Sequence, residues 1–168
     1  IIPYYQPIFC LKTCRCCGLE ALMRWRHPER GLMTPQEFIP FAEETGLIVE
    51  LDHWMLRLAC QQMQLWREKY PDWFPLTLSV NLSPRQFSQR FLVEEIEQIL
   101  TETGWEREHL KVEITEGILI NNYDSAIAFL QHFQERKIQV CLDDFGTGYL
   151  KNFAENLVNI GKSNGYNV

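Results

Sequence analysis

Two adjacent acids, Asp143 and Asp144, end an apolar run at 138–142 and are followed by a glycine-rich turn. An apolar run that passes directly into carboxylates and glycines is typical of a buried strand whose carboxyl end opens into a site. Neighbouring carboxylates repel each other unless a positive charge lies between them, and a hard divalent cation with oxygen ligands often supplies it. On this stretch alone, an acidic turn after a strand is an equally good interpretation.

Further polar side chains fall inside or at the end of other apolar segments that we expect to be strands. They are Glu20 in segment 18–26, Asn81 at the end of segment 76–82, and Glu113 in segment 110–115. Together with Asp143 and Asp144 they supply four carboxylates and an amide, which are the donors that a hard cation prefers. For Asn81, a turn-forming amide before Ser83 and Pro84 is the alternative.

Strands alternate with helices along the chain, and this alternation predicts an α/β fold with a parallel sheet. We expect strands at 4–9, 18–26, 76–82, 110–115 and 138–142, a connection at 11–17, and helices at 35–45, 48–70, 91–102 and 124–136. Functional side chains gather at the carboxyl ends of the strands in such folds. The Trp and Phe residues at helical spacing are predicted to be core, and Glu50 and Asp52 are predicted to favour the first helical turn.

Composition limits the functions to be considered. The chain has 168 residues, 46% of them hydrophobic, and a net charge of −6, which suits one domain with a substantial core. The acidic balance argues against nonspecific nucleic-acid binding, and no apolar run has the roughly 20 residues of a membrane segment. The cysteines at 10, 14, 16 and 17 do not have zinc-site spacing, so we expect reduced thiols and a cytoplasmic protein. Because the first residues resemble a strand already under way, we expect a longer protein at this end.

Six segments, in order along 4–149, resemble the EAL family. They are Y-Q-P-I at 5–8, E-A-L at 20–22, F-I-P-F-A-E-E-T-G-L-I at 38–48, S-V-N-L-S at 79–83, V-E-I-T-E at 112–116 and D-D-F-G-T-G-Y at 143–149. This resemblance implies a phosphodiesterase that hydrolyses cyclic di-GMP to linear pGpG with Mg²⁺ or Mn²⁺. It also implies a TIM-like (β/α) barrel whose first strand is antiparallel.

The resemblance also implies roles for individual residues. Metal would be held by Glu20, Asn81, Glu113, Asp143 and Asp144, and among these Glu20 and Asp144 would be catalytic, with Asp144 positioning the attacking water. Gln6 and Arg24 would contact the substrate, with the guanidinium of Arg24 on a phosphate. The alternatives are an ion pair between Arg24 and Glu20 and a hydrogen bond from Gln6 to a neighbouring loop.

The resemblance ends after Tyr149, so we expect one domain at 1–149 and a divergent tail at 150–168 with a weak amphipathic helix at 150–160. Five expected strands are fewer than the eight of a full barrel, which needs roughly 250 residues. The family's catalytic lysine has no counterpart, because Lys162 stands in a loop-like setting that predicts a surface residue.

Two interpretations of the function follow. The first is a cyclic di-GMP phosphodiesterase domain, weak or inactive as this partial barrel. The second is a non-catalytic, degenerate EAL module for nucleotide binding or protein interaction. In both cases the open sheet edge at 138–142 predicts a homodimer or other self-association.

Overall fold

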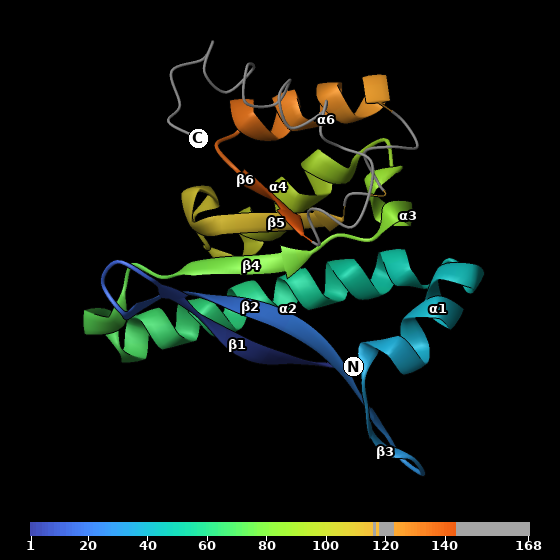
Figure 1. Cartoon of the computed structure of the whole chain (residues 1–168), viewed down its shortest axis with the longest axis horizontal. Coiled ribbons are helices and arrows are strands. Elements are labelled where there is room, and N and C mark those ends of the chain that lie inside the picture. The colour runs from blue at the N-terminus through green and yellow to red at the C-terminus, as the bar shows by residue number, and fades with distance from the viewer. Residues whose placement is uncertain (116, 118–122, 144–168) are drawn as a thin grey trace.

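The computed structural model describes residues 1–115, 117 and 123–143, so Asp144, Lys162 and the predicted helix at 150–160 lie outside the described residues. The described strands form one six-stranded sheet (Figure 1). They are β1 (Ile2–Cys10), β2 (Arg15–His27), β3 (Gly31–Met33), β4 (Thr77–Asn81), β5 (Leu110–Thr115) and β6 (Gln139–Asp143). All five predicted strands are therefore present.

The strand order is β1-β2-β4-β5-β6, with β3 paired to β2 outside this path. β1 is antiparallel to β2, whereas β2, β4, β5 and β6 run parallel to one another. This confirms the predicted α/β class and the antiparallel first strand of a partial TIM-like barrel. β3 was not predicted, because three residues are too few to show alternation; its Met33 pairs with Trp25 of β2.

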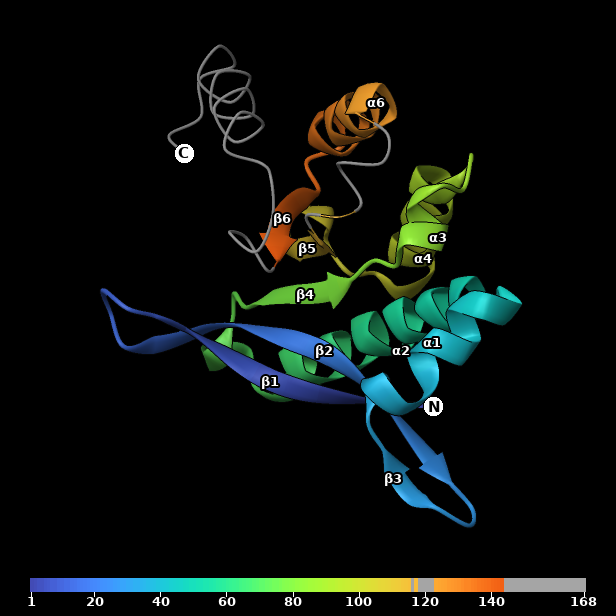
Figure 2. The same ribbon diagram turned by 45° about the vertical axis from the view of Figure 1, so that its right-hand side comes forward.

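Helices connect the parallel strands and lie on one side of them (Figures 1 and 2). They are α1 (Pro35–Thr45), α2 (Ile48–Lys69), α3 (Pro84–Phe87), α4 (Leu92–Thr103) and α6 (Tyr123–Glu135), with 3₁₀ turns η1 (Pro71–Trp73) and η2 (Arg107–His109). α1 begins as expected: the backbone N–H of Thr34 donates to the carboxylate of Glu37 at 2.6 Å. It ends at Gly46, whose φ of 82° lies in the left-handed region. Among the described helices, none has both the length and the apolar character to cross a bilayer.

The core lies between the strands and the helices. Leu78, Val112 and Ile114 of the sheet are almost completely buried, as are Ala59 and Met63 of α2. Because side chains alternate along a strand, the intervening residues point to the opposite face, away from the helices. The sheet thus has one apolar, helix-covered face and one face that can carry polar groups.

The prediction that the Trp and Phe residues at helical spacing are core was wrong in part. Trp54, which belongs to the helical pattern of α2, is 51% exposed. Trp54 lies at the border of the buried stripe of α2. Helical periodicity identifies an apolar stripe, but it does not show how far neighbouring elements cover that stripe.

Candidate functional site

Strand pairing places the predicted site residues on the same face of the sheet. Gln6 of β1 lies opposite Glu20 of β2, and Glu20 is in register with Ser79 of β4. Two residues beyond Ser79, Asn81 is in register with Glu113 of β5. Residues in register on neighbouring strands share a face, so these side chains extend from the face opposite the helices.

Asp143 belongs to the same face. It ends β6 in register with Thr115, two residues after Cys141, which is in register with Glu113. Asp143 is exposed and Glu113 is half-buried. The four parallel strands β2, β4, β5 and β6 thus each contribute an acid or an amide to one polar face.

A hydrogen bond and electrostatic repulsion link these residues. The side-chain amide of Asn81 donates a hydrogen bond to Oε1 of Glu20 at 2.9 Å, across 61 residues of sequence. Burial raises the pKa of Glu113, and the nearby charges of Glu20 and Asp143 raise it further, while the Ser79 hydroxyl opposes the shift. Glu113 therefore lies close enough to both other carboxylates to be repelled by them.

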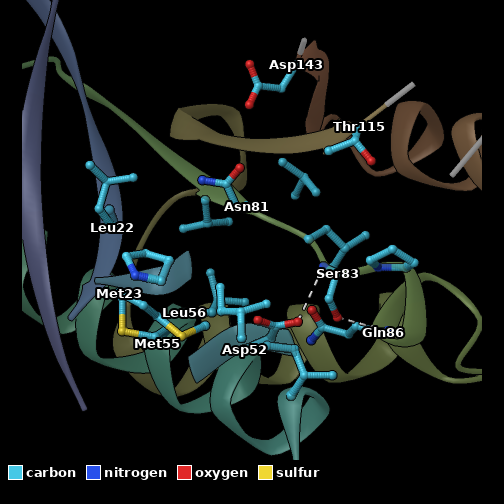
Figure 3. Close-up of a pocket in the computed structure, with 18 of the residues that line it drawn as sticks. Leu22, Met23, Asp52, Met55, Leu56, Asn81, Ser83, Gln86, Thr115 and Asp143 are labelled. Atoms are coloured by element: carbon cyan, nitrogen blue, oxygen red, sulfur yellow. Dashed lines mark hydrogen bonds between the residues drawn. The ribbon is translucent and has the colours of Figure 1, made fainter. Parts of the chain in front are cut away.

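The same strand ends form one wall of a pocket of about 380 Å³. Figure 3 shows Asn81 and Asp143 on the side of this pocket opposite Asp52 of α2. Glu20 and Thr115 also line it. The pocket is thus bounded by the polar strand ends on one side and by α1 and α2 on the other.

The donors suit a hard cation by type, because they are carboxylate and amide oxygens. The mutual repulsion that raises the pKa of Glu113 is also what a bound cation would relieve. However, within 1–115, 117 and 123–143, no three His, Cys, Asp or Glu side chains gather closely enough to hold a metal ion. Asp144, the fifth predicted ligand, lies outside the described residues.

The two predicted substrate-binding residues lie at different places. Gln6 is exposed beside Glu20, at the antiparallel pair of β1 and β2. Arg24 is four residues beyond Glu20 on β2, where its guanidinium donates to the carbonyl oxygen of Met23 at 2.7 Å and lies 5.8 Å from the ring centroid of Tyr4. Among the ion pairs of the described residues, none joins Arg24 to Glu20, so the structure does not contain the alternative pairing.

One acid of the pocket, Asp52, is buried although its place in the sequence suggested a surface charge. Asp52 was predicted to act as a favourable charge in the first turn of α2, but its side chain is buried, with the residue 6% exposed. Its Oδ2 accepts a hydrogen bond from the backbone N–H of Ser83 at 3.4 Å (Figure 3). The pKa of Asp52 is raised to about 7, chiefly by burial and to a smaller extent by the charge of Glu43, while the hydrogen bonds from Ser83 oppose the shift.

A signal for this burial was present in the sequence. Asp52 lies at helical spacing with Met55, Leu56 and Ala59, all of which face the core. An acid in register with an apolar stripe is expected to be buried and hydrogen-bonded. Ser83, its partner, in turn accepts a hydrogen bond from the backbone N–H of Gln86 at 3.2 Å and so caps α3.

Comparison with known proteins identifies the family. The model of the EAL domain matches residues 1–157. The chain is 39% identical over 150 residues to the bifunctional diguanylate cyclase/cyclic di-GMP phosphodiesterase MucR of Pseudomonas aeruginosa, and 40% identical over 149 residues to the cyclic di-GMP phosphodiesterase PdeR of Escherichia coli. Each match covers 89% of this chain and 22% of the relative, so the chain spans about a fifth of the length of these relatives.

Solved structures agree with this result. The structure described as PaMucR phosphodiesterase in complex with c-di-GMP is similar with a TM-score of 0.83 at 38% identity, over 88% of this chain and 59% of that one. The EAL enzyme Bd1971, in its cAMP- and cyclic-di-GMP-bound form, is similar with a TM-score of 0.84 at 27% identity, over 92% of this chain and 43% of that one. The predicted resemblance is confirmed, and this chain belongs to the EAL domain family.

Proposed function

We propose that this chain is a phosphodiesterase domain that hydrolyses cyclic di-GMP to linear pGpG with Mg²⁺ or Mn²⁺. EAL phosphodiesterases depend on metal in general, and similar chains carry the phosphodiesterase name or were solved with the dinucleotide. The observation that carries the proposal is the polar face, where Glu20 and Asn81 are hydrogen-bonded and Glu113 feels the charge of its neighbours.

In this proposal the metal is held by Glu20, Asn81, Glu113, Asp143 and Asp144, and Glu20 and Asp144 are the catalytic members. When bound, divalent metal supplies an activated water and neutralises charge on the phosphoryl oxygens. The amide of Asn81 orients the carboxylate of Glu20, and its own oxygen remains a donor for the cation. Burial and the neighbouring carboxylates disfavour the ionised form of Glu113, and a bound cation would favour that form, which is the one that can act as a ligand.

Gln6 and Arg24 are proposed to bind the dinucleotide. A guanidinium has five N–H donors, so the single bond from Arg24 to the Met23 carbonyl leaves donors for a phosphate. Gln6 is exposed next to Glu20, where its amide can reach a substrate lying across β1 and β2. Both residues then position the phosphodiester over the polar face.

The test is to incubate the chain with cyclic di-GMP and Mn²⁺ and to measure pGpG by chromatography. We expect Glu20→Ala to lower the rate by roughly 10²–10⁴-fold, the usual effect of losing a group that stabilises charge or moves a proton. Glu68→Ala is the matched control, because Glu68 is an exposed acid of α2 outside the pocket. Turnover that survives Glu20→Ala would contradict the proposed roles.

A second function is binding of the dinucleotide without cleavage. It is favoured by the finding that no three of the acids, histidines or cysteines in the described part of the chain gather closely enough to hold a metal. Saturable binding by calorimetry without pGpG formation would support this second function over the first.

We further propose that the chain self-associates through β6. In the described part of the chain β6 pairs with β5 alone, at one end of the strand order. The free edge of such a strand offers backbone donors and acceptors to a second strand, and a second copy of the chain brings the same edge.

A further inference from the structure

A second and larger cavity, of about 790 Å³, lies away from the polar face. It is lined by Tyr5 and Leu19 of the β1–β2 hairpin, by Trp66 of α2, and by Tyr70, Trp73 and Phe74 after α2. Pro75 and Leu76, which also line it, lead into the amino-terminal end of β4, whereas the pocket of Figure 3 lies at the carboxyl end. The two cavities share no lining residue.

Aromatic rings form the walls of this cavity. Tyr70 and Trp73 are stacked, with centroids 4.8 Å apart and planes 16° from parallel. Tyr5 and Trp66 meet edge to face at 4.7 Å. Because Trp73 is 68% exposed, much of its large ring surface is available for a further planar ring.

Polar groups of the cavity lack partners in the described part of the chain. The hydroxyl oxygen of Tyr5 is buried without a hydrogen-bond partner there. Burial also raises the pKa of Tyr5, so this hydroxyl stays protonated and can donate. Arg15 and Asp72 line the cavity, and neither belongs to an ion pair among the described residues.

These groups define the chemistry of a ligand. Stacked aromatic walls favour a flat ring over an aliphatic chain, since π-faces stack with little geometric restriction. A guanidinium and a phenol donate hydrogen bonds to ring acceptors, and a carboxylate accepts from ring N–H groups, so the ring edge must carry both kinds of group. Purine bases have such edges. The cavity volume lies in the usual range for small-molecule sites.

We propose that this cavity binds a purine nucleoside or nucleotide by its base, which stacks on Trp73 and forms hydrogen bonds to Tyr5, Arg15 and Asp72. This site is separate from the polar face, so its occupant does not have to be the substrate of the proposed phosphodiesterase. A purine bound here contacts the end of α2 and the base of the β1–β2 hairpin, which together support β2 and therefore Glu20.

The experiment is a titration of the chain with guanosine in EDTA, followed by calorimetry and tryptophan fluorescence. Guanosine has no phosphate, and EDTA removes divalent metal, so the polar face contributes little to binding. We expect saturable binding that is weakened about tenfold or more by Trp73→Ala, the usual effect of removing a base-stacking ring. Tyr5→Phe, which removes only the hydroxyl, should weaken binding by a smaller factor.

Two controls separate this site from others. Trp54→Ala removes a similarly exposed indole, 51% exposed, which does not line the cavity, and should leave the affinity unchanged. Glu20→Ala alters the polar face and should also leave it unchanged, whatever its effect on pGpG formation. The proposal is overturned by absence of guanosine binding up to millimolar concentration, by full affinity in a folded Trp73→Ala variant, or by loss of affinity in Glu20→Ala.

Discussion

The amide of Asn81 and the carboxylate of Glu20 are hydrogen-bonded at 2.9 Å, which links the carboxyl end of β4 to the middle of β2. Glu20 is thereby held in one orientation on the polar face, and the Asn81 oxygen is left for another partner. For the neighbouring Glu113, burial and the charges of Glu20 and Asp143 disfavour the ionised form, although the Ser79 hydroxyl and the charge of Lys111 oppose them. A cation at this face would reverse that balance.

Divalent metal should therefore stabilise the chain. When Mn²⁺ is about 100 times its Kd, we expect a gain of about 2.7 kcal/mol, or a rise in Tm of roughly 5–10 °C for a chain of this size. The measurement is thermal unfolding at increasing Mn²⁺ concentration. The reference is the same chain in buffer with EDTA and no added metal. A Tm that does not change with Mn²⁺ would exclude a metal site of useful affinity.

Glu113→Gln should change stability in opposite directions with and without metal. Without metal, the amide removes a half-buried charge that two carboxylates repel, so Tm should rise. With Mn²⁺, the variant lacks an anionic ligand and should lose most of the metal-dependent gain. Glu68→Gln, on the exposed side of α2, should show neither effect. A Glu113→Gln variant with the full metal-dependent gain would remove Glu113 from the proposed ligands.

The sequence predicted the strands well, because the two-residue alternation of side chains along a strand is visible in short segments. Alternation along strands placed Glu20, Asn81 and Glu113 in strands, and the order of those strands was enough to expect a shared edge. It could not show that Asn81 donates to Glu20, because that contact depends on the register between β2 and β4. The burial of Asp52 was missed because its position near the start of α2 suggested a favourable surface charge instead.

Asp52 should make stability depend on pH. The pKa of Asp52 is about 7 in the folded chain, compared with 3.8 for an unperturbed aspartate. The folded state therefore binds the proton more tightly than the unfolded state. The contribution is complete below the unfolded pKa and is lost as the pH rises through about 7. Relative to Asp52→Asn, which cannot ionise, the wild type should therefore lose roughly 2–3 kcal/mol between pH 5 and pH 8.

Urea unfolding of both proteins at pH 5 and pH 8 checks this prediction. The comparison uses the difference between the proteins, because other groups titrate in both. Glu43 faces Asp52 and disfavours its ionisation, whereas the Ser83 N–H favours it. A difference that is constant with pH would show that Asp52 does not titrate in this range.

Self-association through β6 should depend on concentration and on the edge of that strand. Sedimentation at micromolar concentrations should show a dimer that dissociates on dilution. Gln139→Lys adds a charge to an exposed position of β6 and should weaken the dimer, as edge lysines do in natural sheets. Gln61→Lys, at an exposed position of α2, is the control and should leave the dimer intact. A monomer over the whole concentration range would contradict an edge-to-edge contact.

Gly18→Ala should disturb the sheet beneath the polar face. Gly18 of β2 is in register with Thr77 of β4, and an added Cβ would lie 2.3 Å from Thr77 Oγ1 and 2.9 Å from its backbone oxygen. Rotation of the hydroxyl, which now donates to the Cys17 carbonyl at 3.2 Å, relieves only the first contact. The strands must then separate, at a cost of about 1–3 kcal/mol.

The separation begins two residues before Glu20, so Gly18→Ala should also weaken the alignment of Glu20 with Asn81 and reduce the Mn²⁺-dependent rise in Tm. Gly31→Ala is the matched control. Its Cβ would meet nothing within 4 Å, although the φ of +75° should cost about 1 kcal/mol through backbone strain. Both variants are thus expected to unfold at lower temperature, but only Gly18→Ala should alter the metal response. Equal metal responses in the two variants would show that the spacing of β2 and β4 does not control the proposed site.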